Sequence, residues 1–181
     1  HSWAFTLDPR TCDPARFSTA YQKLGSLTIT TLAAEIARGA EWLPQLHQLY
    51  TLVAGDVPIP IHPHADAPPS WLAQQAVGLP ESLPDGFFIV RDGPRYVGMS
   101  FLHAGPPGMH RLYQRITAID PTYRGRGIAM ALKLETIAYA RAHGYHEIRT
   151  AVESNNPSML AINTKLGFEA REGLALMIKP L

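Results

Sequence analysis

The chain has 181 residues, of which 46% are hydrophobic and 17% charged, so its length and composition are those of one globular domain and not of a disordered chain. A formal net charge of +1 excludes the strong field that attracts nucleic acid or an anionic membrane, and no apolar run approaches the ~20 residues that cross a bilayer. Cys12 is the only cysteine, which excludes an internal disulfide and a cysteine-based zinc site. We therefore expect a soluble, cytoplasmic protein without a nucleic-acid or membrane partner.

The first 26 residues predict a short strand at residues 3–7, where large apolar residues alternate with small or polar ones. A helix follows, which Asp13 caps and Gly25 ends. The chain begins with His1 and not with methionine. Residues 1–26 are interpreted either as an N-terminal extension that packs on the main domain or as the joint to an upstream domain. In both cases residues 27–181 form the main domain.

The next segment predicts a strand at residues 27–32 and a helical pattern over residues 32–54 that is interrupted at Gly39. Five prolines fall in residues 57–69, so this segment is expected to be an irregular loop. His62 and His64 lie in it, but a proline separates them and Asp66 is the only nearby carboxylate, so we do not expect a metal site. A short helix over residues 70–77, capped by Ser70, ends the segment.

Five or six further strands and two helices are expected in the second half of the chain. Residues 87–90 and 96–102 predict an antiparallel hairpin, and residues 111–119 return as a third strand. Residues 147–152 form a strand parallel to residues 111–119, because a helix-length crossover joins the two. A last helix over residues 155–166 and one or two strands over residues 168–178 follow. The expected fold class is α/β, with a mixed, mostly antiparallel central sheet and helices on both faces.

The crossover helix, from Gly127 to about His143, has an apolar side and a more polar one. Met130, Ala131, Leu134, Ile137 and Ala138 form the apolar side, which we expect to be buried. The opposite side carries Lys133, Glu135, Thr136 and Ala140.

The stretch that joins the third strand to this helix organises the chain. Residues 116–119 are mostly β-branched, Asp120-Pro121 ends the strand, and Arg124-Gly125-Arg126-Gly127 opens the helix. A helix that begins in a glycine-rich turn presents unpaired N–H groups at its positive end, which is an anion site and most often a phosphate site. The alternative is a turn whose glycines only let strand and helix pack closely. The loop lacks the Lys-Ser/Thr pair of a Walker loop and the third glycine of a dinucleotide fingerprint.

Two motifs are similar to those of one family. Residues 124–129 resemble the Arg/Gln-x-x-Gly-x-Gly/Ala signature of the GNAT N-acetyltransferase superfamily, and residues 156–168, which end in Leu-Gly-Phe, resemble its later helix motif at matching spacing. The resemblance is specific from Tyr113 to Phe168, weaker over residues 27–103 and absent before them. It implies a GNAT-like fold with a splayed parallel strand pair, acetyl-CoA as cosubstrate without a metal, and direct acetyl transfer to a primary amine of a small molecule or peptide. Homodimers and tandem GNAT-like domains both occur in the family.

The resemblance also implies which residues contact the cosubstrate. The backbone of the glycine loop would bind the CoA diphosphate, since a side chain at Gly125 or Gly127 would block the phosphates. The pantetheine arm would pair with the end of the third strand, at a bulge near Ala118 and Ile119, where the Ile119 N–H would stabilise the oxyanion. The expected cofactor-binding residues are Ala118, Ile119, Arg124, Gly125, Arg126, Gly127, Ile128, Ala129, Asn156 and Asn163. The alternative for the two arginine side chains is that they are solvated at the surface.

Catalytic groups are harder to identify. Many family members have a tyrosine that protonates the departing thiolate, but Asn163 stands at the corresponding position, and an amide is a poor acid. Glu153, just past the strand over residues 147–152, is our candidate for the general base, with the alternative that it is a solvated carboxylate. Tyr113, Gln114 and His103 are weaker candidates.

Three functions remain open from the sequence. The first is an acetyl-CoA-dependent N-acetyltransferase, which the two motifs in correct order favour. The second is a non-catalytic acyl-CoA-binding half of a tandem GNAT protein, which the missing tyrosine and the unusual N-terminus favour. The third is a nucleotide-binding domain that shares the glycine loop, and the absence of a ribose-binding acid argues against it. The sequence does not identify the acceptor.

Overall fold

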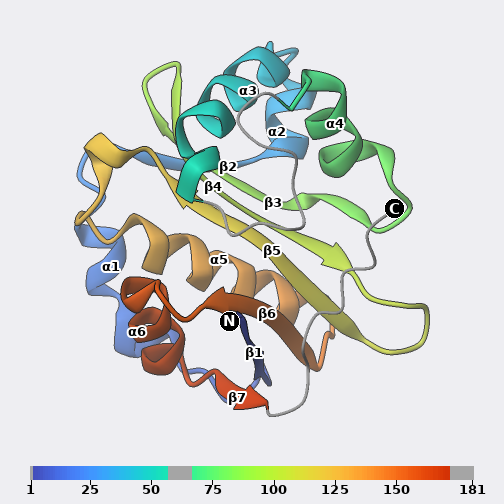
Figure 1. Cartoon of the computed structure of the whole chain (residues 1–181), viewed down its shortest axis with the longest axis vertical. Helices are drawn as coiled ribbons and strands as arrows, with labels where there is room; N and C mark the ends of the chain where they lie inside the picture. Colours follow the sequence, from blue (N-terminus) through green and yellow to red (C-terminus); the bar gives the residue numbers. More distant parts are fainter. Residues whose placement is uncertain (1, 57–66, 172–181) are drawn as a thin grey trace.

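The computed structural model describes residues 2–56 and 67–171, and in these ranges it has a seven-stranded sheet with helices on both faces (Figure 1). The strand order is β2-β3-β4-β5-β6-β1-β7, and every neighbouring pair is antiparallel except β5 and β6. The strands are β1 (Ser2–Leu7), β2 (Thr28–Thr31), β3 (Ser82–Asp92), β4 (Arg95–Ala104), β5 (Arg111–Ile119), β6 (Glu147–Glu153) and β7 (Glu169–Arg171). The helices are α1 (Thr19–Gln22), α2 (Leu32–Ala37), α3 (Trp42–Val53), α4 (Pro69–Ala73), α5 (Ile128–Ala142) and α6 (Pro157–Leu166).

The parallel pair is joined at one end and open at the other. β5 and β6 are in register from Arg111 opposite Glu147 to Tyr113 opposite Arg149. Beyond Tyr113, β5 continues along β4 to Ile119, while β6 continues along β1 to Glu153. The two strands therefore part at Gln114, and the space between them opens toward the carboxyl ends of both (Figure 1). The expected α/β class and the splayed parallel pair are both confirmed.

The N-terminal strand lies inside the sheet. β1 pairs antiparallel with β6 on one side and with β7 on the other, so it separates two strands that are close in sequence. Phe5 and Leu7 of β1 are buried in the main hydrophobic core. The strand predicted over residues 3–7 is thus present and contributes directly to the sheet. The division of the chain at residue 26 stays a prediction.

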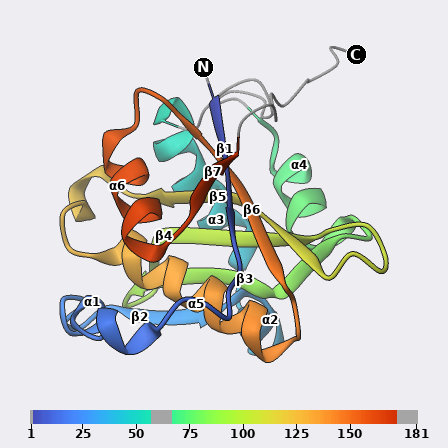
Figure 2. The same cartoon turned by 90° about the horizontal axis from the view of Figure 1, so that it is seen from below.

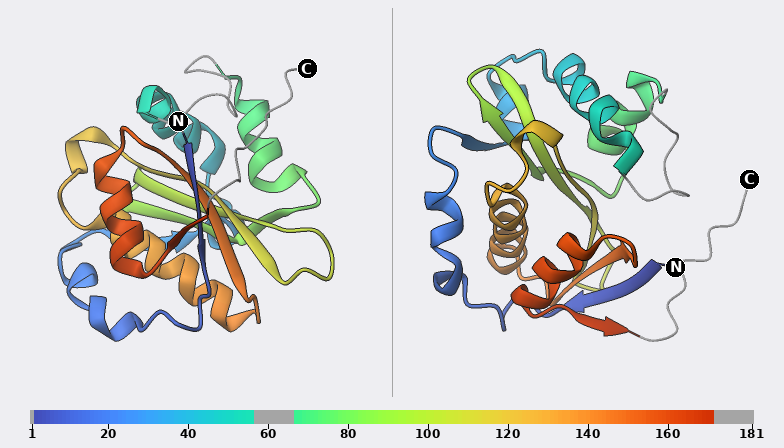
Figure 3. Two further views of the ribbon diagram at one scale, coloured as in Figure 1. Left: turned by 60° about the horizontal axis from the view of Figure 1, so that its bottom comes forward. Right: turned by 60° about the vertical axis from the view of Figure 1, so that its left-hand side comes forward.

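The two faces of the sheet carry separate cores, because side chains alternate along each strand. On one face Leu102 of β4 packs with α5 and with residues around α1 and α6. On the other face Met99 and Phe101 of the same strand pack with α3 and α4, and the Phe101 ring stacks on Phe87 with centroids 4.7 Å apart. The right-hand view of Figure 3 shows these two helical layers on opposite sides of the sheet, and Figure 2 shows α5 crossing beneath it.

Helix α5 is buried on more sides than its sequence pattern predicts. Lys133, Thr136 and Ala140, which were placed on the polar side, are 1%, 0% and 0% exposed, while Ala138 of the expected buried side is exposed. The reason is that Lys133 and Thr136 face the sheet, where both side chains form hydrogen bonds with the Gln114 side chain of β5. Residues before β2 cover another part of the helix. Ala20, Leu24 and Leu27 pack into the same core as α5, and the Arg141 side chain donates to the carbonyl oxygen of Cys12 at 2.8 Å. The expectation for these four residues was therefore wrong.

The other local predictions have mixed outcomes. The helix expected at residues 70–77 is present as α4, followed by a π-helical turn (Gln74–Gly78), but it begins at Pro69 and Ser70 does not cap it. Asp13 caps a 3₁₀ turn (Pro14–Phe17) as expected, by accepting a hydrogen bond from the Ala15 N–H. The loop with His62 and His64, and residues 172–178 of the last predicted strands, lie outside the described residues. Within the described ranges, none of the helices combines the length and the hydropathy that crossing a bilayer requires.

Candidate active site

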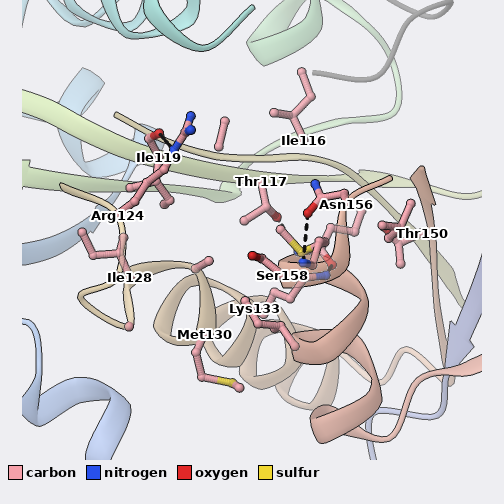
Figure 4. A pocket seen from close by; sticks show the side chains of 18 of the residues that line it. Ile116, Thr117, Ile119, Arg124, Ile128, Met130, Lys133, Thr150, Asn156 and Ser158 are labelled. Atoms are coloured by element: carbon pink, nitrogen blue, oxygen red, sulfur yellow. Dashed lines mark hydrogen bonds between the residues drawn. The ribbon is translucent and has the colours of Figure 1, made fainter. Parts of the chain in front are cut away.

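A cleft of about 890 Å³ lies where β5 and β6 part. Its walls come from the second half of β5, the loop that leads into α5, the end of β6 and the first turns of α6. Figure 4 looks into it, with Thr117 of β5 above, Lys133 of α5 below, and Asn156 and Ser158 at the start of α6. Residues around α1 also contribute, among them Phe17 and Lys23.

The glycine loop forms one end of the cleft and is held by Asp120. The Asp120 carboxylate accepts hydrogen bonds from the Thr122 N–H at 2.9 Å and hydroxyl at 2.7 Å, and it pairs with the Arg95 guanidinium at 2.5 Å. Burial raises the pKa of this carboxyl, but the Thr122 hydrogen bonds and Arg95 outweigh it, so the pKa lies below its ordinary value. The ionised side chain thus fixes the turn that leads from β5 into the loop.

Two glycines shape the loop and leave its backbone open. Gly125 and Gly127 have φ angles of +77° and +76°, a left-handed conformation that side chains disfavour. Gly127 precedes α5 and makes no side-chain cap, so the first N–H groups of this 15-residue helix have no side-chain partner from the capping position. A Cβ atom at Gly127 would lie 3.3 Å from Cδ of Lys23, which shows how closely the residue that follows α1 approaches the loop. The local geometry is that of an anion-binding helix start.

The charges that line the cleft have one sign. Its lining includes five cationic side chains and no carboxylate among the described residues, although the whole chain has a net charge of only +1. Such a cleft attracts a ligand with several negative charges. These cations come from separate parts of the chain, and of the five only Arg124 was expected from the sequence: Lys23, Arg115, Arg124, Lys133 and Lys165.

The backbone of β5 presents polar groups to the cleft. The N–H of Asp120 donates to the carbonyl oxygen of Val97 in β4 at 2.9 Å. Because backbone groups alternate along a strand, the N–H of Ala118 also faces β4, whereas those of Ile119 and Thr117 face the open side. The Ile119 carbonyl oxygen accepts a hydrogen bond from Nε of Arg124 at 3.3 Å on that side (Figure 4).

The β-bulge in β5 lies earlier than the sequence analysis placed it. The register changes between Ser100 opposite Thr117 and Leu102 opposite Gln114, so the extra residue falls at Arg115–Ile116 and not at Ala118–Ile119. The bulge coincides with the point where β6 leaves β5. It places Arg115 close to the parting of the strands, where Arg115 lines both the cleft and a second cavity beside His103 and Tyr113.

Most of the expected cofactor-binding residues line this one cleft: Ala118, Ile119, Arg124, Gly125, Gly127, Ile128, Ala129 and Asn156. Ile128 is 2% exposed and anchors the start of α5 in the core. Asn156 caps α6, where its Oδ1 accepts from the Met159 N–H at 3.0 Å. Arg126 is not among the lining residues, and its guanidinium lies over the ring of Tyr123, 4.9 Å from the centroid.

The two residues expected to matter for proton transfer are placed differently. Glu153 ends β6 opposite Ser2 of β1 and is not among the residues that line the cleft. Asn163 is fully buried beside the cleft helices, and neither polar atom of its side chain has a hydrogen-bond partner among the described residues. Among the weaker candidates, His103 interacts through Nε2 with the Gln75 carbonyl oxygen at 2.9 Å, and burial lowers the pKa of its imidazole.

A buried polar network beneath the cleft was not expected from the sequence. Nζ of Lys133 donates to Oε1 of Gln114 at 2.7 Å, and Nε2 of Gln114 donates to the Ser100 hydroxyl at 3.0 Å. The Ser100 and Thr117 hydroxyls share a hydrogen bond of 2.8 Å. Burial lowers the pKa of Lys133 to about 7. Within the described ranges, no group of three or more histidine, cysteine or acidic side chains could hold a metal ion.

Comparison with known proteins gives a consistent family. The model of the acetyltransferase (GNAT) family matches residues 46–168. The mycothiol acetyltransferase of Amycolatopsis mediterranei is 31% identical over 96 residues, which cover 49% of this chain and 31% of that protein. The chain therefore spans about a third of the length of the curated relatives it matches.

Solved structures share the fold. A GCN5-related N-acetyltransferase from Sphaerobacter thermophilus superposes with a TM-score of 0.64 at 16% identity, over 94% of this chain and 48% of that chain. Naa50 of Arabidopsis thaliana, in complex with the bisubstrate analogue CoA-Ac-MVNAL, superposes with a TM-score of 0.57 at 20% identity, over 80% and 83% of the two chains. Since the family model covers more than half of the sequence, the resemblance of the two motifs is confirmed, and this chain belongs to the GNAT acetyltransferase family.

Proposed function

We propose that the chain catalyses acetyl-CoA-dependent N-acetylation, with direct transfer of the acetyl group to a primary amine. One observation carries this proposal: a cleft between splayed strands, with an open helix start at one end and five cationic side chains but no carboxylate among the described residues of its lining. Coenzyme A matches this shape and charge, because it joins a phosphate-rich end to a long, mostly neutral arm.

The topology supports one direction for the pantetheine arm. The diphosphate would bind the N–H groups of residues 124–129, which follow the end of β5. The pantetheine arm would then run back along β5 from Ile119 toward Gln114, a distance of about 16 Å for five residues of extended chain. The thioester would come to lie near the point where the strands part.

The reaction needs few groups from the protein. The amine nitrogen attacks the thioester carbonyl carbon, the C–S bond breaks, and the sulfur leaves with the electron pair. An N–H on the open side of β5 is our proposed oxyanion donor. The resemblance points to that of Ile119, whereas that of Thr117 faces the same side and lies nearer the parting of the strands, where the thioester would lie. Glu153 remains our proposed base. Deprotonating a lysine-like amine at pH 7 costs ~4–5 kcal/mol but an α-amine only ~1 kcal/mol, so the acceptor decides how much a base contributes.

The names of the similar proteins support a broad class of acceptor. The Naa50 complex contains a CoA-peptide analogue, and the A. mediterranei relative is named for mycothiol. A small-molecule or peptide amine is therefore the acceptor class that we propose.

Calorimetric titration with acetyl-CoA tests the binding half of the proposal, with Gly125→Glu as the variant. Gly125 lines the cleft and has a positive φ angle, and a Cβ atom there would have no neighbour within 4 Å, so the substitution adds charge at the phosphate site without a clash. Gly93→Glu is the matched control, because Gly93 also has a positive φ and open space but lies in the β3–β4 turn. We expect micromolar binding that Gly125→Glu weakens roughly 100-fold and Gly93→Glu leaves unchanged.

A panel of amines with detection of released thiol tests the catalytic half. Turnover of at least one amine supports the proposal. Binding of acetyl-CoA without turnover of any amine would instead support the non-catalytic acyl-CoA-binding function. Binding of ATP or NAD by a folded chain that does not bind acetyl-CoA would contradict both.

A further inference from the structure

The amine of Lys133 is buried at the floor of the cleft, away from any carboxylate of the described residues. The residue is 1% exposed and lines the cleft, and in this part of the chain it forms no ion pair. Its Nζ donates to Oε1 of Gln114 at 2.7 Å and lies 4.9 Å from the centroid of the Phe168 ring. An ammonium group has three N–H bonds, and the hydrogen bond to Gln114 uses one of them, so the amine can donate further hydrogen bonds. A buried cation without a counter-ion is costly, which calls for a reason to keep a lysine here.

The position of Lys133 relative to the splay gives that reason. Gln114 directly follows Tyr113, the last residue at which β5 pairs with β6, so Gln114 marks the deepest point of the splay. Lys133 is the sixth residue of α5, which places it about 7.5 Å along the helix axis from the phosphate-binding end. An arm that runs from the glycine loop along β5 therefore ends with its sulfur beside Gln114, above the Lys133 amine.

Burial, in a cleft whose other charged side chains are cations, governs how readily Lys133 gives up a proton. The charged side chains that line the cleft with it come from the residue after α1, from β5, from the glycine loop and from α6, and all four are cations: Lys23, Arg115, Arg124 and Lys165. Burial lowers the pKa of Lys133 to about 7, and no carboxylate among these lining residues opposes that shift. A thiol has an ordinary pKa of ~8.5, so proton exchange between the two groups is nearly balanced in free energy. Asn163, at the position where the family often has an acid, has no proton to give.

We propose that Lys133 is the catalytic acid that protonates the CoA thiolate as it leaves. When the C–S bond breaks, the sulfur takes the bonding electron pair, and the Lys133 ammonium transfers one proton to it, which gives CoA thiol and a neutral amine. The acceptor nitrogen releases one proton to water, and the neutral amine takes one back from water. The sum is acetyl-CoA plus amine giving amide plus CoA thiol, with no other reactant.

This inference rests on the proposed function, and the pKa of the bound CoA thiol tests it without any knowledge of the acceptor. Thiolate absorbs in the ultraviolet where thiol does not, so a pH titration of the CoA complex reports the ionisation of the bound thiol. The same titration with S-ethyl-CoA, a thioether that has no ionisable thiol, corrects for tyrosines and Cys12. We expect an acid dissociation constant at least roughly tenfold larger in the wild type than in Lys133→Met, because the ammonium stabilises a thiolate that it touches.

Two variants make the test specific. Lys133→Arg keeps the cation and should keep the bound thiol acidic, which shows that loss of folding does not explain the result for Lys133→Met. Arg16→Met removes one exposed cation that does not line the cleft and should leave the thiol pKa as in the wild type. Equal thiol pKa values in the wild type and Lys133→Met, with CoA bound to both, would overturn the role of Lys133 and leave the proposed function intact. Failure of CoA to bind to the folded wild type would overturn both.

Discussion

The rim and the floor of the cleft both carry cationic side chains, but those of the rim are exposed and that of the floor is buried. The rim consists of the glycine loop and three exposed cations, Lys23, Arg124 and Lys165. The floor consists of Lys133 and Gln114, which are 1% and 4% exposed and belong to one hydrogen-bonded network. Exposed cations are screened by salt and keep their protons, so they suit the attraction of an anion. A buried amine exchanges its proton readily near neutral pH, so it suits a step in which a proton moves.

Removing the floor amine should have the largest effect. We expect Lys133→Met to lower kcat by about 10²–10⁴-fold while the KM for acetyl-CoA changes little, because loss of a general acid affects the transition state and not the binding of phosphates. Steady-state release of thiol with an amine from the panel measures this. Lys133→Arg should be similarly impaired, since a guanidinium does not give up its proton. A lower affinity for acetyl-CoA with unchanged kcat would contradict the acid role, and would mean that Lys133 binds the cosubstrate as the rim cations do.

The same substitution should raise stability at neutral pH. Lysine titrates at 10.5 ordinarily and Lys133 at about 7 in the fold, so between these pH values the unfolded chain binds more protons and the free energy of unfolding of the wild type rises with pH. Lys133→Met lacks this titration. It should therefore be more stable than the wild type below pH 7, by about 1–4 kcal/mol, and the difference should shrink as pH rises toward 10.5.

Urea unfolding of both proteins over this pH range measures that difference. A constant gap between the two free energies of unfolding would mean that the Lys133 amine does not change its protonation on folding.

Changes at the rim should be smaller and should depend on salt. Lys23→Met and Lys165→Met should each weaken acetyl-CoA binding by roughly 3–10-fold at low ionic strength, as expected for single exposed charges. The loss should fade at high ionic strength, and kcat should not change. Calorimetry at two salt concentrations measures this. A salt-independent loss would indicate that the side chain acts through packing, as Lys23 could against Gly127.

The smallest effect is expected at Glu153. This residue ends β6 and does not line the cleft among the described residues. Glu153→Gln should therefore lower kcat less than about threefold with an α-amine acceptor, for which a base contributes little. The pH dependence of kcat, compared with an acceptor of the lysine type, tests whether Glu153 acts as the base. A loss above about tenfold with the lysine-type acceptor alone would support that role.

The rim of the cleft was predictable from the sequence because its signals are local. The glycine loop, the strand before it and the helix after it are contiguous, and Gly125, Gly127 and Asn156 all line the cleft, while their contact with CoA stays a proposal. Likewise the hairpin of β3 and β4 and the parallel pairing of β5 with β6 follow from turn residues and connection length.

The floor was not predictable because its burial comes from distant segments. Lys133 falls on the more polar side of α5 in the sequence pattern, but it is buried because that side faces Gln114 of β5 and the ring of Phe168. The place of β1 between β6 and β7 joins residues at opposite ends of the chain, and no local pattern encodes such a pairing. The bulge at Arg115–Ile116 likewise depends on how β5 aligns with β4, which residue types alone do not fix.

A crystal structure of the chain with CoA bound would test the central claim most directly, through one distance, that between the CoA sulfur and Nζ of Lys133. We predict that the phosphates lie on the backbone of residues 124–129 and that the sulfur lies beside Gln114, within hydrogen-bonding distance of the Lys133 amine. A sulfur directed toward solvent, or phosphates bound away from the glycine loop, would contradict the division of the cleft into a binding rim and a proton-donating floor.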